Sequence, residues 1–315
     1  MKQEKAEFYP MKMAPHFKDY LWGGQALRKF NKLGSLPIIA ESWELSTNEN
    51  GLSFVGSGQY KGFSLRDVIK VDPQAVLGGN LVKDLPIIVK LIDAAKDLSI
   101  QVHPSAEDES LMPGISGKSE LWYVVDCKPD AFVYCGFKRE TTADEVRIRS
   151  KNGTICEILN KVAVEKGNSI FVPARTIHAL GAGIVVAEVQ QNSDTTFRVF
   201  DYNRRDKDGN LRQLHLDKAV NVLNFERTSV ENLIQRELTH FKCDFFEVTN
   251  VKVLDEIHLH SDKSRFQALL FLSGSGNIIY NKEKFGFSIG DCYFIPAEIE
   301  RYKIEGCCQF LLIEV

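Results

Sequence analysis

The stretch Gly167-Asn-Ser-Ile-Phe-Val-Pro173-Ala174 recurs later in the chain as Gly290-Asp-Cys-Tyr-Phe-Ile-Pro296-Ala297. Each copy consists of a glycine, five residues that include several apolar side chains, and then Pro-Ala. Glycine permits the left-handed turn that introduces a strand, and proline ends a strand because it cannot donate to the ladder. The repeat therefore predicts two β modules that share a turn–strand–turn unit, although a coincidence between two common segments would look the same.

The segments around both copies are mostly short runs of strand-forming residues separated by turn residues. Helical signals are few: Ser64 and Thr142 are expected to cap two short helices, and 215–224 has apolar residues at helical spacing. Gly-Ser-Gly at 274–276 predicts a turn between two strands. This pattern predicts a mainly β fold of jelly-roll barrels with a few short helices, and disfavours a doubly wound α/β sheet.

Composition restricts the class of function. The chain has 315 residues, 44% of them apolar, which favours two compact domains and excludes a disordered chain. A net charge of −3 gives no electrostatic case for nucleic acid or an anionic membrane. The charged residues 1–7 lead into no apolar run, so we expect no signal peptide, and seven cysteines without a CxxC motif suggest reduced thiols. We therefore predict a cytoplasmic protein that acts on a small molecule, with no nucleic-acid or membrane partner.

The residues after the first copy of the repeat suggest a metal site. His178 lies five residues beyond Pro173, where the jelly-roll superfamily called cupins places its last metal ligand. Gln101 and His103 are two residues apart, so both project from one face of a strand, and Glu120 opens the next predicted strand. Singly, each could be a loop, surface or core residue, but the joint spacing favours a shared site. One amide, two imidazoles and one carboxylate suit Zn²⁺, and would also fit Mn²⁺, Co²⁺ or Fe²⁺.

The second module departs from this template. It contains His258-Leu-His260, but Gln267 and Arg301 occupy the later ligand positions. We therefore expect 1–235 to form a catalytic, metal-binding cupin domain and 236–315 a metal-free cupin-like domain. The two histidines of 258–260 are expected to be surface residues of a strand.

Longer motifs resemble the type I phosphomannose isomerases, and they span essentially the whole chain. They are Tyr20-Leu-Trp-Gly-Gly24, Glu41-Ser-Trp-Glu-Leu-Ser46, Leu98-Ser-Ile-Gln-Val-His-Pro104, Gly117-Lys-Ser-Glu-Leu-Trp-Tyr123, Val172-Pro-Ala-Arg-Thr-Ile-His-Ala-Leu180 and Glu188-Val-Gln-Gln-Asn-Ser-Asp-Thr-Thr-Phe-Arg-Val-Phe-Asp-Tyr202. The length is similar to that of the compact bacterial members. One departure is Ser119, where the family usually has proline.

The resemblance implies an aldose–ketose isomerase, an intramolecular oxidoreductase that interconverts mannose 6-phosphate and fructose 6-phosphate through a cis-enediol. It implies one Zn²⁺ per chain, held by Gln101, His103, Glu120 and His178. The implied active-site positions are Arg198, Lys118, Glu188 and Asp194, with Lys90 a weaker candidate. The expected partner is a sugar phosphate, and the expected assembly is a monomer or a homodimer.

This reaction needs an electrophile for the oxygens, a base for the carbon-bound proton and a cationic group for the phosphate. A desolvated lysine beside a divalent cation can act as the base, and Lys118 is the best candidate, unless it only pairs with a carboxylate. Arg198 could stabilise the enediolate or hold the phosphate, or form a solvated pair with Asp201. Most of Arg204, Arg205 and Arg212 are expected to be solvated, although one could attract a dianion.

Two other functions remain open from the sequence. One is a metal-dependent cupin of different chemistry, such as an iron dioxygenase. The other is a sugar-phosphate-binding regulator that has the scaffold but no catalytic activity.

Overall fold

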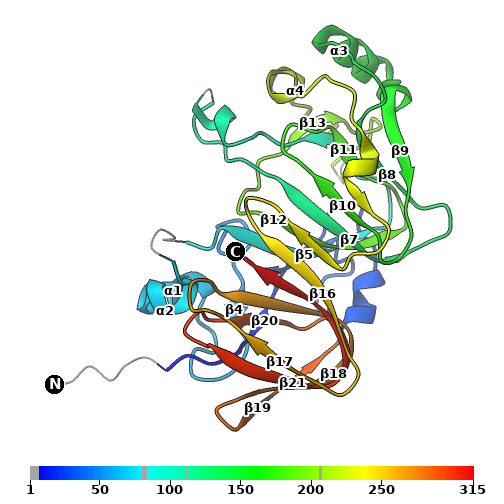
Figure 1. The fold of residues 1–315 in the computed structure, drawn as a ribbon. Helices are drawn as coiled ribbons and strands as arrows, with labels where there is room; N and C mark the ends of the chain where they lie inside the picture. The colour runs from blue at the N-terminus through cyan, green and yellow to red at the C-terminus, as the bar shows by residue number, and fades with distance from the viewer. Residues whose placement is uncertain (1–6, 80–83, 111, 206–207) are drawn as a thin grey trace.

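The computed structural model describes residues 7–79, 84–110, 112–205 and 208–315. The chain is mainly β with a few short helices, as predicted (Figure 1). Residues 1–6, on which the signal-peptide prediction largely rests, lie outside the described residues. Within the described ranges, no helix combines the length and apolar character needed to cross a membrane.

The strands of the first half are β1 (Met11–Ala14), β2 (His16–Lys18), β3 (Glu41–Leu45), β4 (Phe54–Val55), β5 (Ile87–Ala94), β6 (Ile100–Val102), β7 (Glu120–Cys127), β8 (Phe132–Phe137) and β9 (Leu159–Ala163). They are followed by β10 (Ser169–Val172), β11 (His178–Leu180), β12 (Ile184–Gln191), β13 (Phe197–Phe200), β14 (Ile234–Gln235), β15 (His240–Lys242), β16 (Glu247–Val253), β17 (Glu256–His260), β18 (Gln267–Tyr280), β19 (Glu283–Ser288), β20 (Cys292–Ile295) and β21 (Arg301–Glu314). The α-helices are α1 (Leu65–Val71), α2 (Pro73–Leu77), α3 (Ala143–Asn152) and α4 (Leu216–Val222), and the 3-10 helices are η1 (Ala26–Phe30), η2 (Glu107–Ser110), η3 (Ile155–Ile158) and η4 (Val230–Asn232).

Two facing sheets form the first jelly-roll barrel. One has seven strands in the order β14-β10-β7-β12-β5-β3-β2, and the other has five in the order β13-β6-β11-β8-β9. Alternate residues of each strand point inward, so Val124, Ile170 and Val186 of the larger sheet share a core with Val133 and Leu180 of the smaller one. The barrel mouth is the place where functional side chains can project from several strand ends.

Helices α3 and α4 cover the outer face of the five-stranded sheet (Figure 1). Val146 of α3 and Ala219 of α4 belong to one buried cluster with Ile100 and Val102 of β6. Both predicted N-caps are confirmed, Thr142 at the start of α3 and Ser64 at the start of α1. The Thr142 side chain accepts from the third residue of its helix, and Ser64 does the same for α1.

The C-terminal strands form a nine-stranded sheet that packs against the outer face of the seven-stranded sheet. Leu121 and Val189 of the larger barrel sheet share a core with Leu270 and Leu311 of β18 and β21. The chain's first strand joins this C-terminal sheet, because β1 pairs with β20. The division at residue 235 stays a prediction.

Both copies of the sequence repeat form the predicted strands, β10 and β20. The glycines that precede them have left-handed backbones, with φ of 93° at Gly167 and 85° at Gly290. Gly290 also lies against the backbone of η1, since an added Cβ would come within 1.8 Å of the Phe30 carbonyl oxygen. Glycine is therefore required at Gly290 both by conformation and by space.

The predicted turn at 274–276 is wrong. These residues lie inside the single strand β18, which pairs with β21 on both sides of them. The pairing shifts register between Phe271 and Ser273, and Gly274 has φ of 79°. A glycine with positive φ is as compatible with a β-bulge as with a turn, and the sequence alone did not distinguish the two.

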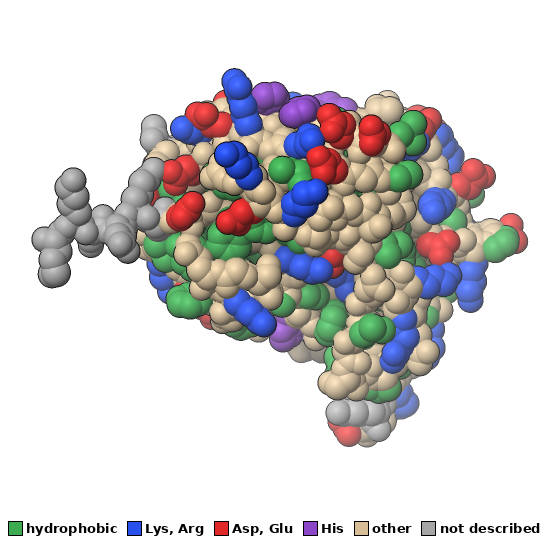
Figure 2. All heavy atoms as spheres, turned by 90° about the horizontal axis from the view of Figure 1, so that it is seen from below, with side chains coloured by type: hydrophobic (Ala, Val, Ile, Leu, Met, Phe, Trp, Pro, Cys, Tyr) green, Lys and Arg blue, Asp and Glu red, His purple; other side chains and the backbone are tan. Residues whose placement is uncertain are grey.

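The surface seen from below in Figure 1 carries basic and acidic side chains side by side, without a broad area of one sign (Figure 2). His258 and His260 are exposed on β17, as expected for surface strand residues.

Candidate active site

Three buried side chains meet at the mouth of the first barrel: His103, Glu120 and His178. His103 directly follows β6, Glu120 opens β7 and His178 opens β11. Their potential ligand atoms all lie within 4.8 Å of one another. His178 is paired with Gln101 across the β6–β11 ladder, so the fourth predicted ligand lies beside the group.

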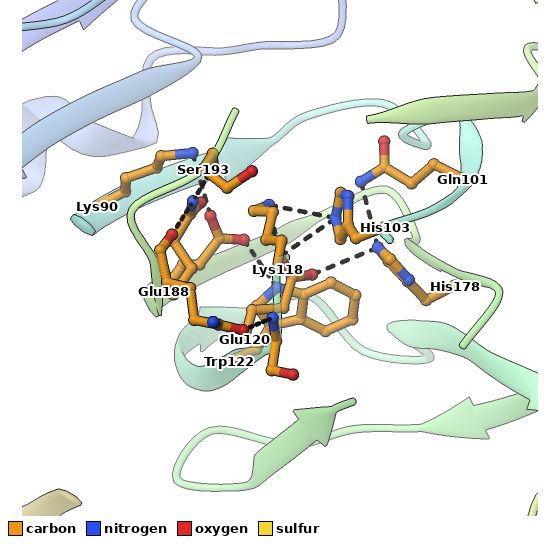
Figure 3. Close-up of polar contacts among 12 residues, drawn as sticks. Lys90, Gln101, His103, Lys118, Glu120, Trp122, His178, Glu188 and Ser193 are labelled. Atoms are coloured by element: carbon orange, nitrogen blue, oxygen red, sulfur yellow. Dashed lines mark hydrogen bonds and ion pairs between the residues drawn. The ribbon is translucent and has the colours of Figure 1, made fainter. Parts of the chain in front are cut away.

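The distances support a common site for all four predicted ligands (Figure 3). The Glu120 carboxylate places Oε2 3.4 Å from His103 Nε2 and Oε1 3.4 Å from His178 Nε2. The Gln101 amide nitrogen lies 3.3 Å from His178 Nε2, and a half-turn of the amide would present its oxygen instead. The structure therefore places the four side chains that the sequence spacing selected close to one another.

Each imidazole is oriented by its second nitrogen. Nδ1 of His103 donates to the Thr195 carbonyl at 2.9 Å, and Nδ1 of His178 donates to the Thr176 carbonyl at 2.8 Å. Because each Nδ1 carries the proton, each Nε2 keeps a lone pair directed at Glu120. Burial, assisted by the charge of Lys118, lowers the pKa of His103 to about 3, and burial also lowers the pKa of His178. Both rings are therefore neutral, which is the form that binds metals.

The described residues around Glu120 fit a divalent cation. Oε1 of Glu120 is buried and has no hydrogen-bond partner among them. Burial alone would raise the pKa of Glu120, but the charge of Lys118 holds it well below its usual value, so the carboxylate is charged. Two neutral nitrogens, a carboxylate and an amide form the mixed nitrogen and oxygen set that zinc and similar ions bind.

Lys118 contacts two of the atoms that would bind a metal. Its ammonium lies 2.6 Å from Glu120 Oε2 and 3.2 Å from His103 Nε2 (Figure 3). These are lone pairs that a cation would need. Metal binding and this arrangement of Lys118 therefore exclude each other.

A second polar cluster surrounds Glu188 on the neighbouring part of the large sheet. Its Oε1 lies 3.3 Å from Lys90 Nζ, and its Oε2 accepts from the Trp122 indole at 2.9 Å. Lys90 also lies 3.7 Å from Glu41 and stacks 4.5 Å above the Trp43 ring. Burial raises the pKa of Glu188, whereas the carboxylates around Lys90 outweigh its burial and raise its pKa. This cluster holds a fixed lysine beside a carboxyl group that takes up a proton more readily than usual.

A pocket of about 450 Å³ lies next to the ligand group, and of the four ligand candidates Gln101 lines it. All four predicted active-site residues line it: Arg198, Lys118, Glu188 and Asp194. Arg198 lies on β13 opposite Gln101, and Asp194 accepts a hydrogen bond from the Asn50 amide.

Other lining residues were not among the predicted site residues. Glu41 and Tyr20 lay inside motifs that carried the resemblance, and Arg212 was one of three arginines of which one could attract a dianion. Lys18 also lines the pocket, but an isolated charged residue gives no local pattern. Its position depends on tertiary folding.

A neutral histidine pair and a buried carboxylate at the mouth of a jelly-roll barrel define a metal-binding cupin. Comparison with known families narrows this class. Residues 11–129 match the model of the phosphomannose isomerase type I catalytic domain, and residues 236–315 match that of the mannose-6-phosphate isomerase cupin domain. The chain belongs to the type I phosphomannose isomerase family.

Individual relatives agree over the full length. The mannose-6-phosphate isomerase ManA of Bacillus subtilis is 34% identical, with 96% of this chain and 98% of that protein covered. The crystal structure of the mannose 6-phosphate isomerase from Bacillus subtilis superposes with a TM-score of 0.88 at 30% identity, covering 97% of this chain and 99% of that one. A putative mannosephosphate isomerase from Archaeoglobus fulgidus shares the fold, with a TM-score of 0.82 at 20% identity over 96% and 97% of the two chains.

Proposed function

We propose that this chain interconverts mannose 6-phosphate and fructose 6-phosphate by moving a proton between C1 and C2 through a cis-enediol. The observation that carries the proposal is the buried group of His103, Glu120 and His178, which contacts Gln101 and Lys118 of a pocket that Arg198 also lines. A metal site beside a guanidinium that forms no ion pair among the described residues suits a substrate that develops negative charge on oxygen. The family membership of the chain supports the same reaction.

The proposed cofactor is one Zn²⁺ per chain, held by Gln101, His103, Glu120 and His178. When bound, such a cation polarises the substrate oxygens on C1 and C2 and stabilises negative charge on them. The buried Glu120 oxygen and the two oriented imidazoles support this assignment.

Lys118 is the proposed base for the carbon-bound proton. Its side chain lies in the pocket next to Glu120, within reach of a substrate placed at the ligand group. Glu188 is the proposed second proton-carrying group, because burial raises its pKa and so makes its carboxylate easier to protonate. Asp194 is proposed to accept hydrogen bonds from sugar hydroxyls, and Arg198 to stabilise the enediolate.

A coupled assay with purified protein tests the reaction. Mannose 6-phosphate is supplied, and fructose 6-phosphate is measured after addition of Zn²⁺, Mn²⁺ or Co²⁺ to chelator-treated protein. We expect turnover that depends on the added metal, and none with unphosphorylated mannose at the same concentration. Absence of fructose 6-phosphate with all three metals would reject the proposed function.

The same preparation separates the two remaining alternatives. A dioxygenase of the cupin class would consume oxygen in the presence of Fe²⁺, which an oxygen electrode detects. A regulator would bind the sugar phosphate in calorimetry without converting it. We expect neither oxygen uptake nor binding without conversion.

The broader setting is also a proposal. We propose a cytoplasmic enzyme that acts as a monomer or homodimer on a small sugar phosphate, without nucleic-acid or membrane partners. We further propose that residues 1–235 carry the complete site and that 236–315 form a metal-free module. The ligand candidates all precede residue 235, which supports this division.

A further inference from the structure

Two arginines from adjacent segments line the pocket next to the ligand group. Arg198 lies on β13, and Arg212 lies in the segment before α4. Arg198 Nη1 donates to the Gln213 carbonyl at 2.8 Å, and its backbone N–H donates to His215 Nδ1 at 3.1 Å. The segment that carries Arg212 therefore runs alongside β13 at the position of Arg198.

These contacts show which of the two arginines lies nearer to the ligand group. Arg198 is paired with Gln101 across the β6–β13 ladder, so it is next to the ligand group. Arg212 belongs to the segment on the other side of Arg198 and is one segment farther from Gln101. A substrate with its reacting carbons at the ligand group would direct its far end toward Arg212.

One buried carboxylate holds Arg212. Oδ1 of Asp201 lies 3.3 Å from Arg212 Nη1 and is shared with Arg204. Arg204 is committed to the protein, because it also donates to the Asp97 carbonyl. Asp201 is therefore a fixed anchor, and Arg212 donates to no other group of the described residues, so its remaining donors are available to a ligand.

The cluster carries uncompensated positive charge. Among the described residues, Arg198 makes no ion pair, and its buried Nε has no hydrogen-bond partner. Arg204 and Arg212 share the single carboxylate of Asp201, so the positive charge of the three guanidiniums exceeds the charge that is paired with them among the described residues. Burial lowers the pKa of Arg198, and the charge of Arg212 lowers it further. An anion with two charges would relieve this repulsion.

Unlike the arginines, the two buried lysines of the pocket, Lys90 and Lys118, are paired with carboxylates and so offer little net positive charge to an anion. Lys90 lies between Glu41 and Glu188, and Lys118 is paired with Glu120. Their charges are compensated by buried carboxylates. A planar guanidinium can also form two parallel hydrogen bonds with a phosphate, which an ammonium cannot.

We propose that Arg212 binds the phosphate group of the substrate and that Asp201 is the positioning residue that holds Arg212 for it. This inference rests on the proposed function in one respect, namely that the ligand is a sugar phosphate. It assigns the phosphate to Arg212, which lies beyond Arg198 as seen from Gln101, and it assigns the reacting carbons to Arg198.

Binding of an unreactive ligand tests the assignment without turnover. Glucitol 6-phosphate has the phosphate but no carbonyl, and its affinity for the Zn²⁺-loaded protein is measured by calorimetry. Arg212→Gln is expected to weaken its binding by roughly 10- to 100-fold, as for loss of a charged hydrogen bond. Arg212→Lys keeps the charge but loses the fork, so an intermediate loss is expected. The matched control is Arg205→Gln, an exposed arginine bonded to the Gly209 carbonyl, with affinity within about twofold of wild type.

Kinetics distinguish binding from general damage to the site. Arg212→Gln and Asp201→Asn are expected to raise KM for mannose 6-phosphate with much smaller changes in kcat and unchanged metal content. Wild-type affinity for glucitol 6-phosphate in both Arg212 variants, or in Arg212→Lys alone if Arg212→Gln does not fold, would overturn the inference. Failure of the wild type to bind glucitol 6-phosphate would overturn it as well. Arg212-dependent binding by a wild type that forms no fructose 6-phosphate would instead reject the proposed function and leave the phosphate assignment standing.

Discussion

At the scale of single residues, the site depends on competition for Glu120. Its carboxylate is buried and charged, and Lys118 lies 2.6 Å from one oxygen. A divalent cation and an ammonium repel each other, and both require the same lone pairs. Lys118 therefore opposes metal binding while it serves the proposed reaction.

Lys118→Met separates these two effects. We expect isomerase activity to fall by more than about 100-fold, because the proposed base is lost. We expect the affinity for Zn²⁺ to be retained or to rise, because a competing charge is removed. Titration against a competing chelator measures the affinity, and Lys138→Met, which changes an exposed lysine, is the control. A tenfold weaker affinity for Zn²⁺ would show that Lys118 supports the metal site instead.

His178→Ala tests the ligand group itself. The ring is fully buried, and its Nε2 lies 3.4 Å from Glu120. Its removal takes away one proposed ligand, so we expect the protein to lose its bound metal and more than about 100-fold of its activity. Metal analysis after gel filtration measures the bound ion. His240→Ala, which changes an exposed histidine of the C-terminal module, should keep wild-type metal content. Stoichiometric metal in His178→Ala would exclude His178 as an essential ligand.

At this scale, the sequence predicts contacts between residues that are close in the chain better than contacts between distant strands. Gln101 of β6 and His103 just after it are two residues apart and so share a face, and His178 follows a recognisable turn, so spacing alone suggested a common site. Glu41 and Glu188 flank Lys90 only because β3 and β12 both pair with β5. No short-range pattern encodes such a contact, and only the family motifs drew attention to Glu41.

At the scale of secondary-structure elements, helix α3 shows how local signals determine a boundary. Thr142 accepts from the backbone N–H of Glu145, and the Glu145 carboxylate accepts from Arg139, Arg149 and Thr141. These contacts lie within ten residues of one another, so the helix start was predictable. Strand β18 was not, because its bulge depends on pairing with β21 far along the chain.

Glu145→Gln tests the electrostatic part of this helix start. Hydrogen bonds from Arg139 and Arg149 lower the pKa of Glu145 from 4.5 to about 2. A carboxyl group whose pKa is lower in the folded state stabilises the folded protein at pH values above its ordinary pKa. This contribution is lost as the pH falls toward 2. We expect the variant to lose about 1 kcal/mol of unfolding free energy at pH 7, and the difference to shrink between pH 5 and pH 3.

Urea unfolding at several pH values measures this difference. Glu140→Gln, which changes an exposed acidic residue just before the helix, is the control and should show no comparable loss at pH 7. A Glu145→Gln difference that stays constant from pH 7 to pH 3 would mean that the charge of Glu145 does not stabilise the helix.

At the scale of the whole molecule, the two modules share one apolar core. The outer face of the seven-stranded sheet packs on the C-terminal sheet, and the Gln309 amide donates to the Tyr123 hydroxyl at 3.0 Å across this interface. The N-terminal strand β1 belongs to the C-terminal sheet. The sequence repeat indicated two modules, but it contained no information on how they pack, since that depends on residues distant in the chain.

Because this core is shared, we expect both modules to unfold in a single transition. The three tryptophans, Trp22, Trp43 and Trp122, all precede residue 235, so their fluorescence reports on the first module. Cys292 and Cys308 are buried in the C-terminal module, and their labelling by a thiol reagent reports on the second. The two signals should have the same urea midpoint.

Ile304→Ala makes this test decisive. Ile304 is fully buried in the C-terminal module and belongs to a different apolar cluster from the shared interface. Its truncation should cost about 2–5 kcal/mol. If folding is coupled through the shared core, this loss lowers the midpoint of tryptophan fluorescence as well as that of cysteine labelling. Leu311→Ala, in the interface itself, should likewise shift both signals. If Ile304→Ala shifted cysteine labelling alone, the modules would fold independently despite the extensive contact between their sheets.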